Sequence, residues 1–200
     1  MPRDKTITNE KIVRAMTEEF LTWGYERASL TRISAKVGIT TAGLYRHFSS
    51  KEDMFHFLVK DTLEDFQKLT SRASREISVE ESYNPFQIDL AATWTEFIYS
   101  HHEGVKLLVC CSAGSRFENF EEELIRMEAD GNKAFAEALR KAGRMKNEVS
   151  DMQWHILATA YVHLMLEAVR HDMPREEALK HMQFVGDLLY PGWMQLYGIE

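Results

Sequence analysis

Residues 38–55 read GITTAGLYRHFSSKEDMF, a short stretch that is rich in hydrogen-bonding side chains. A glycine turn opens it, and the adjacent threonines Thr40 and Thr41 follow. Hydrogen-bonding side chains fill one side of a short helix, while the other side carries only Leu44 and Phe48. So brief a helix buries little surface on its own. We therefore predict that its apolar side anchors it and that its polar side lies against a polar partner.

The neighbouring residues complete a helix-turn-helix pattern. Ser29 is placed to cap a helix over 30–37, Gly38 is placed to end it, and a further helix is expected over 40–47. In this motif the second helix lies in the major groove of DNA and presents its N-terminal residues to the bases. Small or hydroxyl-bearing side chains are expected near bases, and donors near phosphates. These residues are Thr40, Thr41, Ala42, Gly43, Tyr45, His47 and Lys51.

Each of these residues also has an interpretation that needs no DNA. Thr40 is suited to capping its own helix, a role compatible with a DNA contact. Tyr45 is alternatively a half-buried core residue. His47 and Lys51 are alternatively ordinary solvated side chains.

The distribution of charge favours DNA contact at the N-terminal part only. The 200-residue chain has a formal net charge of −7. Residues 1–60 hold 10 Lys and Arg against 7 Asp and Glu, whereas residues 61–200 hold 14 against 24. An acidic surface repels phosphates. We therefore expect the acidic remainder of the chain to serve another purpose.

Helical periodicity dominates the sequence, so we predict an all-α fold of about nine helices. We expect an N-terminal helix-turn-helix domain over 1–50, a connecting helix over 51–73 and a ligand-binding and dimerisation domain over 74–200. A polar loop is expected over 74–84. The remaining predicted helices cover 9–23, a segment that starts at Pro85 and ends at Gly104, 105–111, 117–142, 151–170 and a last helix opened by Pro174.

Local signals set several of these boundaries. Glycine is expected to end the first helix, capping boxes to open the fourth helix and the helix over 151–170, and a proline-glycine pair to kink or interrupt the last one. The residues concerned are Gly24, Ser49 with Glu52, Ser150 with Gln153, and Pro191 with Gly192.

Residues 20–58, FLTWGYERASLTRISAKVGITTAGLYRHFSSKEDMFHFL, resemble the DNA-binding region of the TetR/AcrR family of bacterial transcriptional regulators. The resemblance implies a homodimer that represses transcription by binding a pseudo-palindromic operator. It adds Thr31 and Arg46 to the expected DNA contacts. It also implies pairing of two copies through 151–170 and 175–197, whose apolar faces include Leu166 and Leu188.

The same resemblance places a cavity for a small effector among the C-terminal helices. Aromatic and polar side chains on those helices are the candidates, although such stripes more often form a simple core. The candidate ligand-binding residues are Trp94, Phe97, His101, Trp154, His155 and Tyr161. We expect a small hydrophobic or aromatic effector. No cofactor and no metal site is expected, because His155 and His163 are eight residues apart and do not share a helix face.

Two further expectations concern class and location. No phosphate loop, nucleophile with a base, or strong metal signature is present, so we expect a regulator and not an enzyme. No apolar run reaches the length of a membrane span, and the charged start is unlike a secretory signal, so a cytoplasmic protein is expected. A DNA-binding regulator without a small-molecule switch remains the alternative function.

Overall fold

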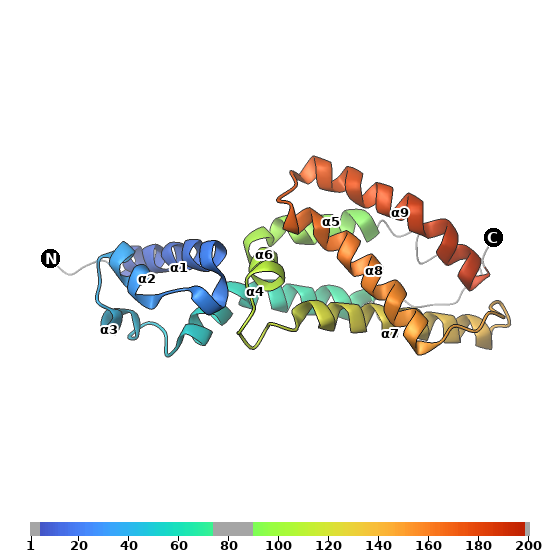
Figure 1. Ribbon diagram of the computed structural model, residues 1–200, viewed down its shortest axis with the longest axis horizontal. Helices are drawn as coiled ribbons and strands as arrows, with labels where there is room; N and C mark the ends of the chain where they lie inside the picture. Colours follow the sequence, from blue (N-terminus) through green and yellow to red (C-terminus); the bar gives the residue numbers. More distant parts are fainter. Residues whose placement is uncertain (1–4, 74–89, 199–200) are drawn as a thin grey trace. The chain divides into compact units, whose positions relative to one another are not determined.

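The computed structural model describes residues 5–73 and 90–198 of the chain. Over these ranges the chain forms nine α-helices and no strand, which confirms the predicted all-α fold (Figure 1). The predicted loop over 74–84 and the helix start at Pro85 lie outside the described residues. The helices are α1 (Lys5–Arg27), α2 (Leu30–Val37), α3 (Thr41–Leu44), α4 (Lys51–Ala73), α5 (Leu90–Ser100), α6 (His102–Cys110), α7 (Phe120–Lys141), α8 (Asp151–Arg170) and α9 (Arg175–Tyr197).

The chain divides into two compact units. Unit 1 comprises Met1–Asp65 and His101–Asn119, and unit 2 comprises Phe66–Ser100 and Phe120–Glu200. The helix α4 supplies residues to both. These units differ from the predicted domains, because α6 and the residues after it pack with the N-terminal helices.

Unit 1 is built around the first half of α4. Phe20 of α1 and Phe55 of α4 are fully buried, and their rings meet edge to face with centroids 5.2 Å apart. The helix α6 lies against α1, where the Tyr25 amide donates to the Cys111 carbonyl at 2.7 Å. This hydrogen bond joins the end of α1 to the residue after α6, and so helps to hold α6 in unit 1.

Two predicted helix ends at glycines in unit 1 have different outcomes. Gly24 interrupts α1 as predicted: its φ of 69° and ψ of 166° are non-helical and kink the segment, and a second helical stretch reaches Arg27. Gly104 does not end a helix, since it lies inside α6. A Cβ added at Gly104 would come within 1.9 Å of Thr62 Oγ1, so glycine here permits close packing of α6 on α4.

The recognition segment is also shorter than predicted. The helix α3 spans only Thr41–Leu44, and a turn follows it. The helix α4 begins after a cap that uses Ser50 and Asp53 in place of Ser49 and Glu52: the Asp53 amide donates to Ser50 Oγ at 3.0 Å. Asp53 in turn accepts from the Ser49 amide at 3.0 Å. The cap is thus shifted by one residue, and the Asp53 carboxylate bonds to the residue before the cap.

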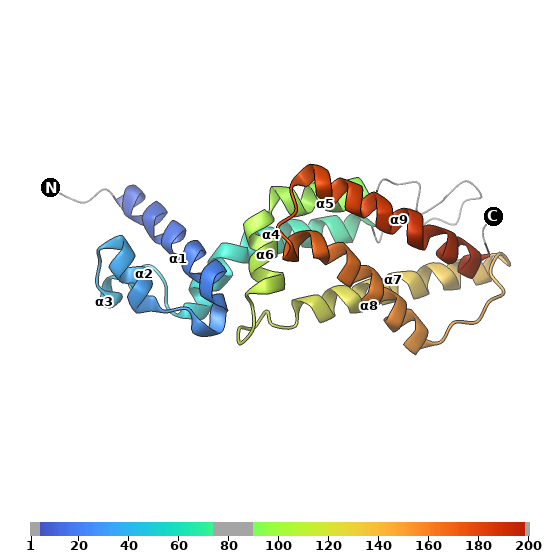
Figure 2. The ribbon, with the colours of Figure 1, turned by 45° about the horizontal axis from the view of Figure 1, so that its top comes forward.

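Unit 2 contains α5, α7, α8 and α9. Figures 1 and 2 both show α9 beside α5 and α8 beside α7, in agreement with the contacts between these helices. The predicted capping box of Ser150 and Gln153 is confirmed at the start of α8. The helix α7 continues through Gly131, and α9 continues past Pro191 without interruption.

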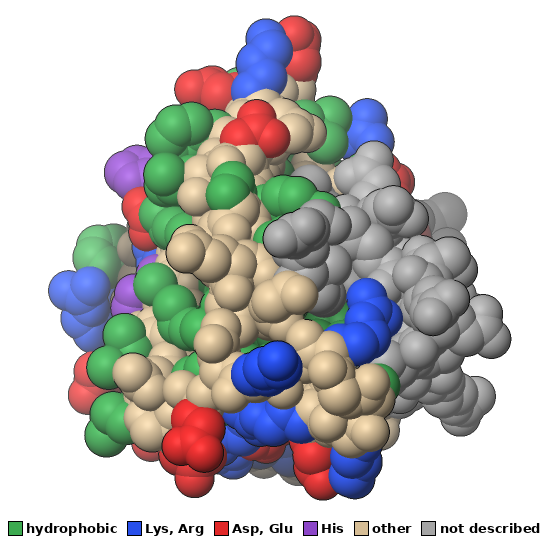
Figure 3. All heavy atoms as spheres, turned by 90° about the vertical axis from the view of Figure 1, so that its right-hand side faces the viewer, with side chains coloured by type: hydrophobic (Ala, Val, Ile, Leu, Met, Phe, Trp, Pro, Cys, Tyr) green, Lys and Arg blue, Asp and Glu red, His purple; other side chains and the backbone are tan. Residues whose placement is uncertain are grey.

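Hydrophobic side chains are also exposed on unit 2. Figure 3 shows that such side chains gather along one side of the face it views, with charged groups mainly toward the top and bottom edges. The large exposed apolar residues of α8 and α9 are Met152, Ile156, Phe184 and Leu188. In contrast, Leu166 is only 2% exposed and belongs to the core of the chain itself.

Candidate functional site

The α2–α3 motif is fixed by backbone and hydroxyl hydrogen bonds. Ser29 caps α2, and Gly38 ends it with a left-handed φ of 74°. Thr40 caps α3, where its Oγ1 accepts from the Gly43 amide at 3.0 Å. Ser34 Oγ and Thr41 Oγ1 lie 3.3 Å apart and link the two helices. Hydrogen bonds within the motif therefore hold α2 and α3 in a fixed orientation to each other.

The two sides of the recognition segment differ as the sequence predicts. Leu44 is fully buried and Phe48 is 7% exposed. Tyr45 is 49% exposed, and Arg46 and His47 are exposed beside it. Within the described part of the chain, none of these three polar side chains makes a hydrogen bond or an ion pair. Their donors face solvent and are available to an external anion.

The remaining predicted DNA-contacting residues occupy the same segment or the helix before it. Thr31 and Ala42 are exposed, and Thr41 is half-buried by its contact with Ser34. A Cβ added at Gly43 would lie 3.3 Å from Thr40 Oγ1, which is tighter than ordinary contact. A side chain at position 43 would therefore require the Thr40 hydroxyl to shift by a few tenths of an ångström.

Lys51 differs from the other candidates because the protein already engages it. Its ammonium donates to the Glu26 carbonyl at 3.0 Å and lies 4.7 Å from the centre of the Tyr25 ring. Burial lowers the pKa of Lys51, although Glu19 and Glu26 act in the opposite direction. Burial and the neighbouring Glu52 raise the pKa of Tyr25 to about 12. A phosphate contact by Lys51 would require its ammonium to leave the Glu26 carbonyl.

The predicted ligand-binding residues fall into separate places. Trp94 and Phe97 of α5 pack with Phe66, with ring centroids 6.0 and 5.9 Å from it. Trp154 of α8 stacks on Tyr197, 5.8 Å away. The predicted set therefore draws on a group formed by α4 and α5 and on a pair formed by α8 and α9.

Tyr161 packs against α9, as Trp154 does, and the two predicted histidines lie elsewhere. The Tyr161 and Trp193 rings meet edge to face at 5.1 Å. His155 is exposed on α8. His101 belongs to unit 1, where its Nε2 lies 3.3 Å from Asp65 Oδ2.

A polar group that sequence reasoning missed, Asn132 with Glu128, adjoins the Trp154–Tyr197 pair, and we name these four residues the Glu128 cluster. The Tyr197 hydroxyl donates to Asn132 Oδ1 at 2.6 Å, and Asn132 Nδ2 donates to Glu128 Oε1 at 3.0 Å. Loss of solvent raises the pKa of Glu128, against the opposing effect of the Asn132 hydrogen bond. The i,i+4 spacing of Glu128 and Asn132 on α7 is the only sequence signal for this group.

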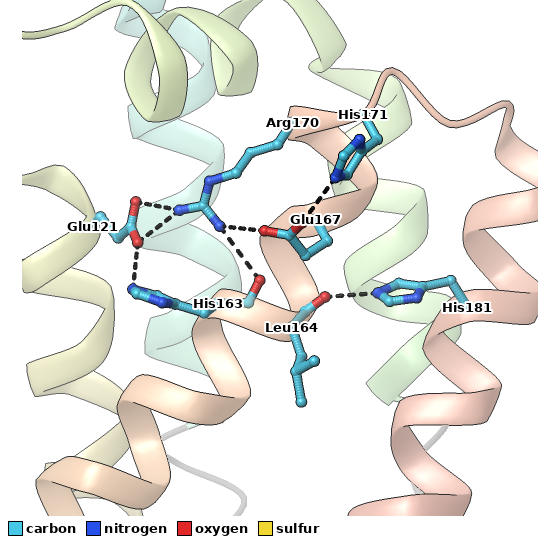
Figure 4. A network of polar contacts seen from close by, with 7 residues as sticks. All are labelled: Glu121, His163, Leu164, Glu167, Arg170, His171 and His181. Atoms are coloured by element: carbon cyan, nitrogen blue, oxygen red, sulfur yellow. Dashed lines mark hydrogen bonds and ion pairs between the residues drawn. The ribbon is translucent and has the colours of Figure 1, made fainter.

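A second polar network, shown in Figure 4, joins α7 and α8. Arg170 Nη2 donates to both Glu121 oxygens at 2.7 Å, and Nη1 donates to Glu167 at 2.9 Å. His163 Nε2 lies 2.7 Å from Glu121, and His171 Nε2 lies 3.0 Å from Glu167. The Arg170 hydrogen bond lowers the pKa of Glu167. Each of these side chains therefore has a partner within the network. Through Glu121 of α7, His163 and Arg170 of α8 hold the two helices together.

Within residues 5–73 and 90–198, no group of three or more potential metal-binding side chains occurs. Over the helices described, none combines the length and hydropathy needed to cross a bilayer.

The α2–α3 motif, anchored on its apolar side and exposed on its polar side, has the form of a helix-turn-helix. Residues 12–58 match the bacterial regulatory proteins of the tetR family. The nucleoid occlusion factor SlmA of Photobacterium profundum is 39% identical over 57 residues, which are 28% of this chain and 29% of that protein. The match thus spans less than a third of that relative's length.

Two solved structures share the fold over nearly the whole chain. NalD, the secondary repressor of the MexAB-OprM multidrug efflux pump in Pseudomonas aeruginosa, aligns with a TM-score of 0.57, 17% identity and coverage of 96% of both chains. The transcriptional regulator FadR of Bacillus subtilis, solved in complex with stearoyl-CoA, aligns with a TM-score of 0.55 and 15% identity, covering 96% of this chain and 100% of that one.

Proposed function

We propose that this protein is a ligand-responsive transcriptional repressor that binds a pseudo-palindromic operator in the cytoplasm as a homodimer. The observation that carries the proposal is the recognition segment. Its apolar residues Leu44 and Phe48 are buried, while Tyr45, Arg46 and His47 are exposed without partners in the described chain. A segment anchored on one side and polar on the other fits the major groove.

The proposed contacts divide by chemistry. Thr41, Ala42 and Gly43 approach base edges, where the methyl groups favour thymine. Tyr45 and His47 hold phosphates, and Arg46 serves either purpose. Thr31 and Thr40 contribute hydroxyls from the start of each helix, and Lys51 contributes where its ammonium leaves Glu26.

The homodimer rests on exposed apolar surface of α8 and α9. Single exposed apolar residues are common, but pairs at helical spacing on two adjacent helices indicate an interface. Met152 and Ile156 are 65% and 57% exposed on α8, and Phe184 and Leu188 are 62% and 58% exposed on α9. We propose that these four residues pair with those of a second copy as a four-helix bundle.

The dimer is tested by Ile156→Glu combined with Leu188→Glu. Two charges in an apolar interface carry a desolvation cost, so sedimentation at micromolar concentration should give a monomer that remains helical. Met127→Glu is the matched control, because Met127 is 37% exposed on α7, outside the proposed interface. A double variant that stays dimeric contradicts this interface.

The effector is proposed to bind in unit 2 and to act through α4. Trp94, Phe97, Trp154 and Tyr161 supply aromatic surface there, consistent with a small hydrophobic or aromatic compound. The helix α4 contributes to both units. We propose that a change at its C-terminal half is transmitted along it to the recognition segment. NalD and FadR share the fold, and FadR was solved with stearoyl-CoA bound.

The experiment combines DNA binding with release. Full-length protein is mixed with fragments of its own genome in a gel shift, and a library of aromatic and hydrophobic compounds is then added. We expect a specific shifted fragment and at least one compound that weakens its binding roughly 5–150-fold, as typical coupling of 1–3 kcal/mol allows. Specific binding that no ligand of unit 2 alters would favour a regulator without a small-molecule switch. Absence of any DNA binding would remove the proposal.

A further inference from the structure

The two basic residues of α2 both pair with carboxylates of α1. The helices lie side by side in unit 1 (Figures 1 and 2). Arg32 Nε donates to Glu19 Oε1 at 2.8 Å, and the Lys36 ammonium pairs with Glu18. In the part of the chain that the structure describes, α2 therefore presents no unpaired cation to an external partner.

The Arg32 guanidinium is held by three groups of α1. Besides the bond from Nε, its Nη2 lies 2.5 Å from the same Glu19 oxygen and donates to the Arg27 carbonyl at 2.9 Å. Its central carbon lies 4.9 Å from the centre of the Trp23 ring. The Arg32 side chain is nevertheless 48% exposed. This cation is thus at the surface, but it is turned toward α1.

Glu19 holds Arg32 with a carboxylate that the fold keeps in place. Glu19 is only 8% exposed, and its Oε1 also accepts from the Ser29 amide at 2.8 Å. Ser29 is the residue that caps the start of α2, where a negative charge is favoured by the helix dipole. Hydrogen bonds between ionised groups are also the stronger ones. Glu19 therefore anchors the start of α2 and supplies the counter-charge of Arg32.

The cation of the recognition segment is placed differently. Arg46 is exposed and has no ion pair with any residue in the described ranges. On α2, the exposed neighbour of Arg32 is Thr31, which offers a hydroxyl and no charge. Cations that contact phosphates add affinity for DNA of every sequence. The pairing of Arg32 with Glu19 thus leaves Arg46 as the unpaired cation of the motif.

We infer that Glu19 is a positioning residue that keeps Arg32 off the DNA backbone and so lowers the affinity of the protein for DNA of any sequence. This inference rests on the proposed function and concerns the same DNA-binding motif. Without the Glu19 charge, the half-exposed Arg32 side chain is free to turn to a phosphate. A genome offers a large excess of non-specific sites. Weaker binding to those sites leaves more of the protein free to reach its operator.

The test measures binding of the full chain to a duplex of random sequence, where phosphate contacts dominate. Fluorescence anisotropy at several salt concentrations gives the affinity and its salt dependence. Glu19→Gln keeps an oxygen acceptor for the Ser29 amide, but it removes the charge that holds Arg32. We expect affinity to rise roughly tenfold at about 50 mM salt and roughly threefold at about 200 mM. The slope of log affinity against log salt should steepen by about one, as one added phosphate contact requires.

Glu19→Gln combined with Arg32→Gln assigns the gain to one guanidinium. The double variant has the net charge of the unaltered protein, and its two amides can still hydrogen-bond to each other. Its affinity and salt slope should equal those of the unaltered protein. A slope that stays steep means that the gain does not come from Arg32. A slope shallower than that of the unaltered protein means that Arg32 contacts phosphate even beside Glu19. Either result overturns the inference, and the second is decisive even should Glu19→Gln alone fail to fold.

Glu10→Gln is the matched control for the change in net charge. Glu10 is an exposed glutamate of α1, and over residues 5–73 it has no ion pair. This variant should leave the salt slope unchanged and raise the affinity less than Glu19→Gln does, because it releases no cation. A Glu19 that serves folding alone predicts the opposite of a gain, since a loosened motif binds DNA less well. An affinity of Glu19→Gln equal to or below that of the unaltered protein therefore overturns the inference.

The same titrations separate this inference from the proposed function. Absence of any DNA binding by the unaltered protein removes the proposed function, and the role of Glu19 with it. DNA binding by the unaltered protein with no gain in Glu19→Gln removes the role of Glu19 alone. A gain that Arg32→Gln cancels, in a protein that selects no operator, supports the role of Glu19 and removes the proposed repressor.

Discussion

The exposed side of the recognition segment in unit 1 and the Glu128 cluster in unit 2 both present polar groups that lack a partner of opposite charge in the described chain. They differ in their access to water. Arg46 and His47 are exposed, so water solvates them without loss. Glu128 is partly buried, and its raised pKa records the cost of that burial. An unpaired exposed group can thus bind an external partner without a prior cost of burial, whereas an unpaired desolvated carboxylate is destabilising in its ionised form.

The largest effect should come from placing a negative charge on the exposed side of the recognition segment. Ala42→Glu puts a carboxylate at a position that we propose to lie against DNA, where like-charge contact costs several kcal/mol. We expect operator affinity to fall by about 100-fold or more, measured by fluorescence anisotropy. Ala42 is exposed, so thermal unfolding should be unchanged. Unchanged affinity would show that α3 does not enter the groove.

The next largest effect concerns the paired network of unit 2. Arg170→Met leaves Glu121 and Glu167 without their main cation, so the free energy of unfolding should fall by about 1–3 kcal/mol in urea denaturation. The control is Lys141→Met, because the Lys141–Glu137 pair is solvent-exposed and should contribute nothing measurable. Equal effects of the two substitutions would mean that the Arg170 network is merely a surface pair.

A smaller effect should separate two basic residues of unit 1. Arg46→Ala removes an unengaged cation, so it should weaken DNA binding and reduce the slope of log affinity against log salt by about one. Lys51→Ala should change that slope less, because its ammonium is held by the Glu26 carbonyl. A larger change for Lys51→Ala would show that this contact is given up to a phosphate.

The smallest effect concerns the pH dependence of stability. The pKa of folded Glu128 is raised by loss of solvent, so its favourable contribution is present below the ordinary value of 4.5 and is lost as pH rises through the folded value. Glu128→Gln should therefore gain stability relative to the unaltered protein as pH rises above 4.5. Urea unfolding at several pH values measures this difference. A constant difference would mean that Glu128 titrates normally.

Local features of the fold could be predicted from the sequence, and tertiary ones could not. The Ser150 cap, the bounds of α8 and the buried positions of Leu44 and Phe48 each follow from residues within one or two turns. The prediction of a helix end at Gly104 is wrong, because the role of this glycine depends on Thr62, a residue on another helix. The predicted interruption at Pro191 does not occur, and α9 runs through it.

The candidate sites also differ in whether they depend on local sequence or on tertiary packing. The recognition segment is contiguous, so its residues could be predicted together. The Glu128 cluster joins residues from three helices, and Tyr197 is 65 positions away from Asn132. No periodicity links such residues, and only packing of α7, α8 and α9 brings them together. The sequence therefore offers Trp154 and Tyr161 as candidates without connecting either of them to Glu128.

The central claim is that α3 reads DNA, and selection from random duplexes tests it most directly. Full-length protein is used to enrich a pool of random double-stranded DNA over several rounds at physiological salt, with Ala42→Glu processed in parallel. We predict enrichment of two inverted half-sites with centres about one helical turn (~34 Å) or more apart, for the unaltered protein alone. Failure to enrich any sequence, or enrichment of the same sequence by Ala42→Glu, would contradict the account.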